Sequence, residues 1–417
     1  MQLIISRYKK ILSENTKLIG FGFSMIFFSS IGQTFFIGLF GPEIQSEFSL
    51  SHTNWSSIYM IGTLASAIIM LWTGPMIDRY QLKGFSITVC AFMLVACIFF
   101  AFVNGPIALC LGILFLRHSG QALASHTGVT SMGRYFLHDR GSALALASMG
   151  QSVAEASLPI LTILTIGLIG WRLTYVIAAI IIAVICIPIV IYLLSDHEKT
   201  HATHVTSQKT NNQLHNNKLD WTRSQVLRDA RFYLLLPGSI ATSMIITAFF
   251  FHHLNIATYK QWDSSWITGN YILYASTSIL ATLFAGALID KFSAQKITLY
   301  KLIPLALAAL SLGIYDHYLV VIPYMIFLGL NVGFSHTTSS ALWAELYGVS
   351  HLGSVKSLLM SLSVLSSAIG PVIVGVLLDN GITIETICIY IALYIITSNI
   401  LFIVAFKIKP QQHLTIT

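Results

Sequence analysis

Two charged residues lie deep inside long apolar runs of this chain, where a charge is costly. Arg117 stands about eleven positions into the run 106–132, and Glu155 about fourteen positions into the run 141–168. Runs of this length cross a membrane as helices, and a charge at the membrane centre costs roughly 2.5–3.5 kcal/mol even on lenient scales. The two helices run in opposite directions, so the two charges can meet at matching depth. We predict that this pair binds substrate or couples a proton, and a buried ion pair that only fixes helix packing is the alternative.

Other polar side chains fall at similar depths and complete the predicted site. Histidine titrates near neutral pH, which makes three of them candidates for proton handling: His118, His126 and His336. The remaining candidates could form hydrogen bonds with a substrate: Gln33, Gln121, Gln151, Asn270, Tyr274 and Asn331. Each can instead make a packing hydrogen bond. His252 and His253, near the outer end of their span, are candidates for gating access.

Membrane helices must position these residues, and the composition predicts such helices. Of the 417 residues, 55% are hydrophobic and 9% are charged, against about 25% charged in a soluble domain. An ordinary soluble enzyme is therefore excluded. A window of about 19 residues finds twelve apolar spans: 18–42, 52–76, 84–104, 106–132, 141–168, 172–194, 232–257, 265–289, 296–314, 319–344, 353–378 and 384–406. We predict an all-α membrane protein with six-helix bundles at 1–194 and 232–417, joined by a polar cytoplasmic linker at 195–231.

The basic residues predict the orientation of these spans. The segments between successive spans alternate between the two sides of the membrane. Of the 23 Lys and Arg residues, 20 lie on the same side as the amino terminus and two, Arg172 and Lys260, lie on the other side. The remaining one, Arg117, lies within a span. Because basic loops stay in the cytoplasm, both termini are expected there. We expect a multi-pass protein of a bacterial inner membrane or a plasma membrane, with the lipid bilayer as its solvent.

Several kinds of chemistry are not expected. The five cysteines lie in apolar runs without metal-like spacing, so we predict buried thiols and no metal or other cofactor. The net charge of +7 has no basic and aromatic cluster with it, so no nucleic-acid partner is expected. HExxH occurs once, at His197 to His201, inside the polar stretch that we interpret as a solvated cytoplasmic linker. The sequence has no GxSxG or GxxxxGK[ST] pattern, which argues against an enzyme and against an ATP-driven pump.

An internal repeat relates the two halves at a constant offset of 212 residues. Several residues match without a gap: Gly74 with Gly286, Asp78 with Asp290, Tyr135 with Tyr347, Gly141 with Gly353 and Pro159 with Pro371. The offset relates span two to span eight and span five to span eleven, so the halves run in the same direction through the membrane. They are predicted to be parallel repeats about an axis along the membrane normal.

These motifs resemble the major facilitator superfamily of secondary transporters over nearly the whole chain. Gly74, Asp78, Arg79 and Lys83 resemble its cytoplasmic loop signature, and Gly286, Asp290 and Lys291 resemble a weaker copy. The resemblance implies that these residues form a cytoplasmic gate, to which we add Arg140 at a helix end. The segment Arg117-His118-Ser119-Gly120 resembles the fourth-helix motif, whose arginine is associated with proton coupling.

A narrower resemblance concerns the substrate. The stretch Gly32-Gln33-Thr34-Phe35-Phe36 and the later Arg140-Gly141-Ser142-Ala143 resemble the branch of monocarboxylate and oxalate–formate carriers, which implies a small organic anion. Span eight, from Trp266 to Leu288, has no basic residue, so Arg117 would have to bind a carboxylate.

The sequence thus predicts a secondary transporter that moves a small organic solute, expected to be an anion or carboxylate, by proton-coupled symport and alternating access as a monomer. Substrate and proton would share the region of Arg117 and Glu155. A proton-driven efflux antiporter for amphipathic compounds is the nearest alternative. A membrane sensor without transport is the alternative of another class.

Overall fold

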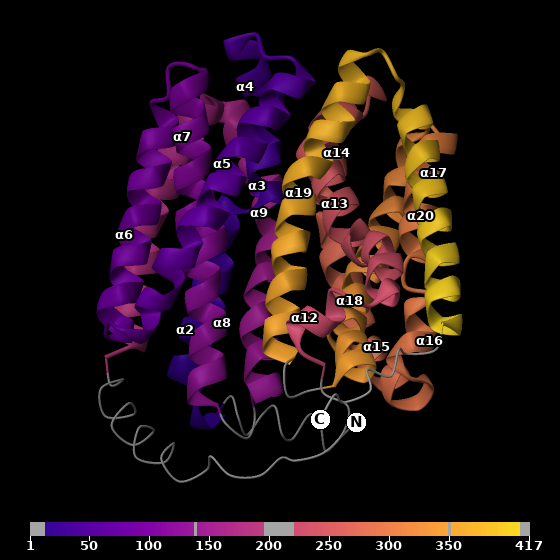
Figure 1. Ribbon diagram of the computed structural model, residues 1–417. Helices are drawn as coiled ribbons and strands as arrows, with labels where there is room; N and C mark the ends of the chain where they lie inside the picture. Colours follow the sequence, from indigo (N-terminus) through magenta and orange to yellow (C-terminus); the bar gives the residue numbers. More distant parts are fainter. Residues whose placement is uncertain (1–12, 137–139, 196–220, 349–351, 409–417) are drawn as a thin grey trace. The chain divides into compact units, whose positions relative to one another are not determined.

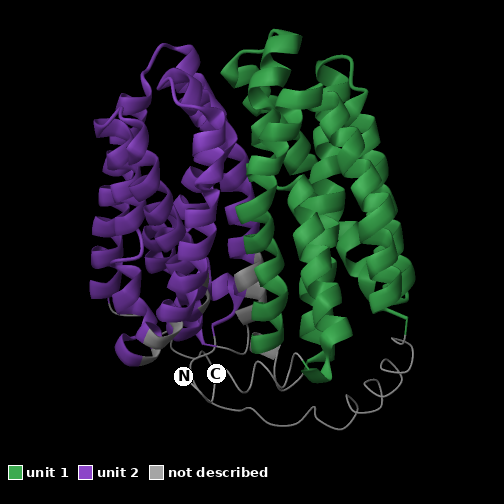
Figure 2. Ribbon diagram, turned by 180° about the vertical axis from the view of Figure 1, so that it is seen from behind, with its two compact units in different colours: residues 1–215 green, residues 216–417 purple. Residues whose placement is uncertain are grey.

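The computed structural model describes residues 13–136, 140–195, 221–348 and 352–408, and every regular element within these ranges is helical. Side chains are left undescribed at 140, 141, 286, 287, 290, 336, 340, 352–354, 356 and 357. The chain divides into two compact units, unit 1 at residues 1–215 and unit 2 at residues 216–417, which Figure 2 shows in different colours.

Helices occupy all six predicted spans of unit 1 (Figure 1). In chain order they are α2 (Thr16–Ser29), η1 (Ser30–Gly32), α3 (Thr34–Ile37), η2 (Gly38–Phe40), α4 (Gly41–Phe48), α5 (His52–Thr73), η3 (Gly74–Asp78), α6 (Leu82–Ala101), α7 (Pro106–Leu116), η4 (Arg117–Ala124), α8 (Ser125–Tyr135), α9 (Arg140–Ile181), η5 (Ile182–Cys186) and α10 (Ile187–Leu193). The long α9 carries two predicted spans, because its backbone leaves the helical conformation at Gly170, where φ is +80°. Glycine adopts this conformation without steric cost.

Helices also occupy the six predicted spans of unit 2. They are α12 (Arg223–Val226), α13 (Ala230–Tyr259), α14 (Ser264–Gly269), α15 (Tyr271–Phe292), α16 (Ala294–Thr298), α17 (Ile303–Ile314), η6 (Tyr318–Val320), α18 (Val321–Tyr347), α19 (Leu352–Asp379) and α20 (Ile384–Lys407). Short polar side chains begin several of them. The carboxylate of Asp229 accepts a hydrogen bond from the backbone N–H of Arg231, and the hydroxyl of Thr383 accepts one from that of Thr386. Such caps satisfy N–H groups that have no partner within the helix.

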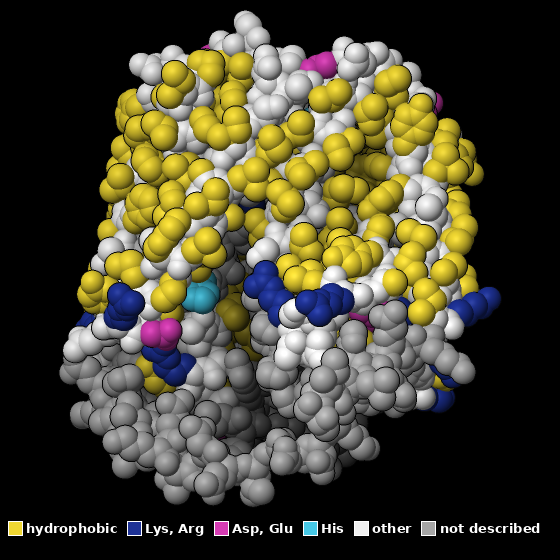
Figure 3. All heavy atoms as spheres, viewed as in Figure 1, with side chains coloured by type: hydrophobic (Ala, Val, Ile, Leu, Met, Phe, Trp, Pro, Cys, Tyr) yellow, Lys and Arg dark blue, Asp and Glu magenta, His cyan; other side chains and the backbone are white. Residues whose placement is uncertain are grey.

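The helix surfaces suit a lipid environment. Nine helices in the described residues are long and apolar enough to cross a membrane, or ten when the bent pair Thr16–Gly32 and Thr34–Phe48 forms one span. Large apolar side chains point outward, and Leu71, Ile107 and Leu168 are 71%, 81% and 83% exposed. On each unit, Figure 3 shows hydrophobic side chains over most of the visible face and basic side chains towards one end. Hydrocarbon, unlike water, stabilises such a surface.

An ion pair joins three helices at one end of unit 1. The carboxylate of Glu47, in α4, accepts hydrogen bonds from Arg172 Nη2 at 2.6 Å and from Trp171 Nε1 at 2.7 Å. The same guanidinium donates to the carbonyl oxygens of Ala101 and Val103 at 2.7 and 2.8 Å. The first span, the start of the sixth and the loop after the third are thereby held together.

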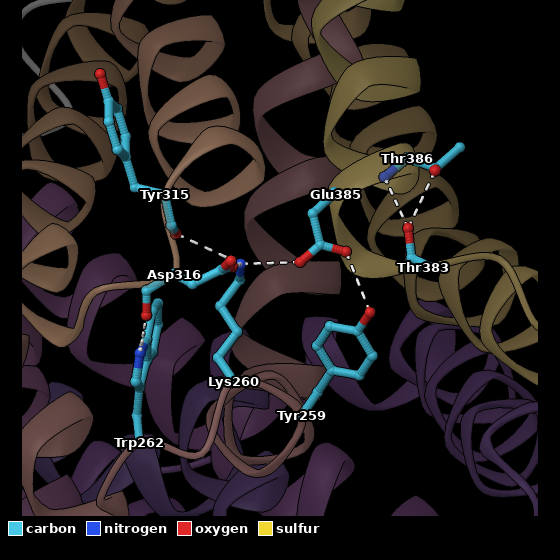
Figure 4. A network of polar contacts seen from close by, with 8 residues as sticks. All are labelled: Tyr259, Lys260, Trp262, Tyr315, Asp316, Thr383, Glu385 and Thr386. Carbon is cyan, nitrogen blue, oxygen red and sulfur yellow. Dashed lines mark hydrogen bonds and ion pairs between the residues drawn. The ribbon is translucent and has the colours of Figure 1, made fainter.

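Unit 2 has a corresponding corner with the charges exchanged (Figure 4). The ammonium of Lys260, after α13, donates to Asp316 Oδ1 at 2.5 Å and to Glu385 Oε1 at 2.9 Å. It also donates to the carbonyl oxygen of Tyr315 at 3.4 Å. The repeat offset pairs Tyr315 with Val103, which shows that the two corners occupy equivalent places in the repeat. The base is Arg172, in the sixth span, in unit 1, and Lys260, after the seventh span, in unit 2.

Candidate functional site

The first span of unit 1 is interrupted in its middle. After η1 the backbone is extended at Gln33, with φ −85° and ψ 156°, before α3 begins at Thr34. The helix segments on the two sides of this break are bent by 43°. A broken helix within a membrane leaves backbone groups without helical partners, and side chains must satisfy them. The run Ser29-Ser30-Ile31-Gly32-Gln33-Thr34 is rich in small and polar residues, which favours a break at this point.

The fourth span contacts this break through backbone atoms. A Cβ atom added to Gly32 would lie 2.2 Å from the carbonyl oxygen of Leu116, and one added to Gly120 would lie 2.7 Å from the nitrogen of Gly32. Such distances are shorter than any van der Waals contact, so only glycine allows this approach. The segment that makes the contact is η4, a π-helical stretch that begins at Arg117. Local π-helical stretches are frequent at functional sites.

Arg117 occupies the space beside the break. Its side chain is buried, with 1% of the residue exposed. Nη1 donates to the carbonyl oxygen of Gly32 at 3.1 Å and to the hydroxyl of Thr34 at 3.3 Å. The guanidinium carbon lies 5.2 Å from the centre of the Tyr59 ring, and the Tyr59 hydroxyl hydrogen-bonds with Thr34. A cation over an aromatic face gains roughly 0.5–2 kcal/mol.

One edge of this guanidinium remains available. Nε and Nη2 of Arg117 are buried and have no hydrogen-bond partner among the described residues. These two nitrogens point their N–H groups from the same edge of the planar group. That fork fits the two oxygens of a carboxylate or phosphate. Buried N–H groups without partners are rare and call for a physical explanation.

Glu155 reaches the same level of unit 1 on α9. A Cβ on Gly22 would approach Ala147, and a Cβ on Gly150 would approach Phe23 and Phe27, so α2 and α9 pack closely in parallel. This register places Glu155 beside the end of α2, at the level of the break. The carboxyl group is largely buried, with 8% of the residue exposed, and its Oε1 accepts a hydrogen bond from Gln151 Nε2 at 3.0 Å.

The sequence predicts that the charges of Arg117 and Glu155 meet, but the structure shows no ion pair between them. Within the described residues, neither side chain forms an ion pair, although both lie near the same break. The physical reason is the carbonyl oxygen of Gly32, which the interrupted helix leaves without a helical partner and which Arg117 binds instead.

The other predicted residues of unit 1 take different positions. Gln33 forms the break, and the backbone nitrogen of Gln121 lies 2.8 Å from the Cβ position of Gly32, so both belong to the site. His118 faces away from it, with its ring nitrogens 3.4 Å from the Ser66 hydroxyl and 3.2 Å from the Thr73 hydroxyl. His126 is half-buried and contacts Thr130 at 3.4 Å. Within the described residues, neither the ring of His118 nor that of His126 hydrogen-bonds with Arg117.

The predicted gate residues are only partly described. In unit 1, Gly74 is buried at the start of η3, and Asp78 forms an ion pair with Arg134 at the end of α8. Arg79 and Lys83 have no ion pair within the described residues. Sequence reasoning missed Arg134 as the partner of Asp78, although a cation at a helix carboxyl end is favourable. In unit 2, Lys291 is exposed at the end of α15. The side chains of Arg140, Asp290 and His336 and the surroundings of Gly286 fall outside the described part of the chain.

Unit 2 contains a buried polar group centred on His253. Its Nδ1 lies 2.8 Å from the hydroxyl of Tyr271, and its Nε2 lies 2.7 Å from the hydroxyl of Tyr324. The histidine is 1% exposed, so this arrangement does not present it as an outer gate. Its neighbour His252 is also buried and lies 2.9 Å from the carbonyl oxygen of Pro371. Sequence reasoning missed both tyrosines, since nothing local links them to His253.

The other predicted residues of unit 2 satisfy backbone groups or pack against rings. Asn270 donates to the carbonyl oxygen of Trp266 at 2.7 Å, and Tyr274 packs on Phe250 with ring centres 4.9 Å apart. Asn331 is fully buried and donates to the carbonyl oxygen of Lys301 at 2.9 Å. That carbonyl lies in the turn between α16 and α17, where the ninth span is interrupted.

A metal centre finds no support in the residues that the structure describes, which contain no cluster of three or more His, Cys, Asp or Glu side chains placed to hold an ion. The site of unit 1 instead offers a cation with a free edge, a separate carboxyl group and an interrupted helix. These groups can bind an anion and exchange a proton.

Comparisons with known proteins agree with this architecture. A family model described as Major Facilitator Superfamily matches residues 22–371 and also residues 254–416. No curated protein is similar enough in sequence to match the chain.

Solved structures share the fold at low sequence identity. A nucleoside transporter, NupG, is 14% identical with a TM-score of 0.70, over 95% of this chain and all of that one. A bacterial homolog of the human lysosomal transporter Spinster, in an inward-facing and unoccupied conformation, is 13% identical with a TM-score of 0.65, over 93% of this chain and 96% of that one. The predicted all-α membrane fold is confirmed.

Proposed function

Because the chain belongs to the major facilitator superfamily, we propose that this secondary transporter couples the movement of a small organic anion to that of a proton. Arg117 binds the anionic group of the substrate, and Glu155 carries the proton. The observation that supports this proposal most is the buried edge of Arg117, where Nε and Nη2 have no partner among the described residues.

The two roles of the guanidinium are separate. Nη1 donates hydrogen bonds to Gly32 and Thr34 and thereby fixes the plane of the guanidinium beside the break. Substrate can bind without breaking these two hydrogen bonds. The opposite edge then receives two oxygens in parallel, which adds geometric specificity to the charge interaction. Tyr59 under the guanidinium restricts its tilt.

Glu155 is suited to carry the transported proton because it forms no ion pair with a basic residue among the described residues. Its described hydrogen bond comes from the amide of Gln151, so a proton can be gained or lost without breaking an ion pair. Arg117 cannot take this role, since a guanidinium does not deprotonate in proteins.

Coupling follows from alternating access, in which the bundles present the site to each side in turn. With one proton for each monovalent anion, the cycle moves no net charge. The pH gradient then drives accumulation, at about tenfold per pH unit because one unit corresponds to 1.36 kcal/mol, and the membrane potential contributes nothing.

The test is uptake into proteoliposomes with an imposed pH gradient. The panel should contain small carboxylates, amphipathic cations and nucleosides, the last because a structural neighbour is a nucleoside transporter. Glu155→Gln should abolish pH-driven accumulation but keep exchange of labelled for unlabelled substrate. Glu43→Gln, at an exposed acid of α4, is the matched control and should behave as wild type.

Three results would contradict the proposal. Unchanged pH-driven uptake in Glu155→Gln would remove Glu155 from coupling. Loss of exchange as well as accumulation would give Glu155 a structural role. Outward movement of amphipathic cations driven by protons, without carboxylate uptake, would favour the efflux alternative.

A further inference from the structure

A groove opens in unit 1 between the second and third spans, away from Arg117. Its volume is about 620 Å³. The end of α5, the turn that follows it and the first turns of α6 form its walls, and Leu123 contributes from η4. Cavities of roughly 300–1,000 Å³ hold small organic ligands or parts of larger ones.

The lining of this groove is mainly apolar. Met76, Phe85, Val89 and Phe92 are among its lining residues. Gly84 also lines the groove, and a Cβ atom there would meet nothing within 4 Å. A flexible hydrocarbon chain is the chemistry that such a surface stabilises.

Basic residues flank one end of the groove. Arg79 and Lys83 are the chain neighbours of the lining residues Tyr80 and Gly84. The nearby acid Asp78 is already paired with Arg134, so it does not neutralise them. Arg79 is exposed, Lys83 is half-buried, and neither has an ion pair within the described residues. The positive charge is therefore free to attract an anion.

We propose that this groove binds an anionic phospholipid. One acyl chain lies along Phe85 and Phe92, and the phosphate of the headgroup contacts Arg79 and Lys83. An apolar groove that ends in two cations complements a lipid with an anionic headgroup, and basic pockets between membrane helices bind such headgroups. Neither Arg117 nor Glu155 takes part, so this site is independent of the transport proposal.

The experiment measures thermal unfolding of the purified full chain in detergent with added lipid. Phosphatidylglycerol and phosphatidylcholine with the same acyl chains are compared, and glycerol 3-phosphate tests for a site that binds only free phosphate. Phosphatidylglycerol should raise the midpoint in a saturable manner, more than phosphatidylcholine does, while glycerol 3-phosphate should have no effect.

Two sets of variants test the binding of the acyl chain and the binding of the headgroup separately. Gly84→Leu adds an apolar side chain at a lining position where a Cβ atom meets nothing within 4 Å, and it should weaken phosphatidylglycerol binding about tenfold, which corresponds to 1.4 kcal/mol. Gly167→Leu, at another helical glycine with open space above it, is the matched control and should bind as wild type. The double variant Arg79→Gln with Lys83→Gln should lose the preference for phosphatidylglycerol over phosphatidylcholine.

Opposite results would overturn the proposal. These are equal stabilisation of wild type by both lipids, stabilisation by glycerol 3-phosphate alone, or undiminished lipid binding in Gly84→Leu. If Gly84→Leu does not fold, Thr88→Phe makes the same test, because Thr88 is an exposed residue of the groove wall.

Discussion

The two units surround a repeat-equivalent tyrosine with different polar groups. The repeat offset of 212 residues pairs Tyr59 with Tyr271. In unit 1, Tyr59 lies under the guanidinium of Arg117, which keeps two buried N–H groups without partners among the described residues. In unit 2, Tyr271 bonds to His253, whose second nitrogen is bonded to Tyr324. The offset pairs Arg117 itself with Gly329, a glycine that packs against the backbone of α15.

This difference separates a polar group that stabilises the fold from one that is available to a ligand. A buried network whose members are all satisfied makes one arrangement rigid, whereas a buried donor without a partner is costly. The ring nitrogens of His253 are both occupied, so we expect it to hold the helices of unit 2 together. The free edge of Arg117 gains its partners when an anion binds.

The largest expected effect is on substrate binding in unit 1. Arg117→Leu removes one partner of a buried charge interaction, which costs about 2–5 kcal/mol. Substrate affinity should fall at least about thirtyfold by the usual relation of 1.4 kcal/mol per tenfold. Equilibrium binding of labelled substrate measures this. Arg117→Lys keeps the charge but loses the fork, and full affinity in that variant would argue against bidentate binding.

In unit 2 we expect a loss of stability without a loss of affinity. His253→Phe leaves the hydroxyls of Tyr271 and Tyr324 without this partner, at about 1–3 kcal/mol for each buried group. The unfolding midpoint should fall, while the substrate dissociation constant stays within about twofold, a difference below 0.5 kcal/mol. Thermal unfolding and binding on the same sample make the check. A large affinity change in a folded protein would show that the two centres are not separate.

Two glycine contacts sharpen the same comparison. A Cβ on Gly120 would press on the break at Gly32, and a Cβ on Gly370 would press on the carbonyl of Met244 in unit 2 at 2.3 Å. Overpacking costs about 1–3 kcal/mol, so Gly120→Ala and Gly370→Ala should both lower stability. Substrate affinity should fall only in Gly120→Ala, because that contact sets the position of the Arg117 anchor. Equal effects of both variants on affinity would contradict this reasoning.

The smallest expected effect concerns the charge-exchanged corners. Burial alone would lower the pKa of Lys260, but hydrogen bonds from its ammonium to Asp316 and Glu385 hold that pKa above its ordinary value. The stabilisation is therefore complete below the ordinary lysine pKa of about 10.4 and is lost as the pH rises through the higher folded value.

Two variants measure this pH-dependent stabilisation. Lys260→Arg should remove the alkaline loss, because arginine keeps its charge at that pH. The difference from wild type above about pH 10.5 should be at most about 1 kcal/mol, since the partner acids are partly exposed to water. Unit 1 already has arginine at this corner, so Arg172→Lys should introduce an alkaline loss. Identical alkaline unfolding in all three proteins would contradict the assignment.

The sequence predicts the helices well because apolar length is a local signal. Each predicted span contains helix, and Arg117 stood out because a charge is expensive at that depth. Its partner could not be derived in the same way. The interruption at Gln33 frees a carbonyl oxygen that competes with Glu155, and only the small and polar residues from Ser29 to Thr34 hint at it.

Contacts between distant segments are the other limit. Tyr271 and Tyr324 meet His253 from separate helices, and their spacing in the chain carries no signal for that meeting. The repeat offset, which pairs Tyr271 with Tyr59, is the one sequence signal that singles out Tyr271, and it does not single out Tyr324. Likewise, the pairing of Asp78 with Arg134 depends on how the second and fourth spans pack.

The most direct measurement compares an organic acid with its methyl ester as ligands of the wild-type protein. The acid should be one that the uptake panel identifies as a substrate, and the readout is the shift of the unfolding midpoint with ligand concentration. A ligand at 100 times its dissociation constant stabilises by about 2.7 kcal/mol. If the free edge of Arg117 binds the carboxylate, the acid stabilises the protein and the ester, which carries no charge, does not. Equal stabilisation by acid and ester would contradict the account.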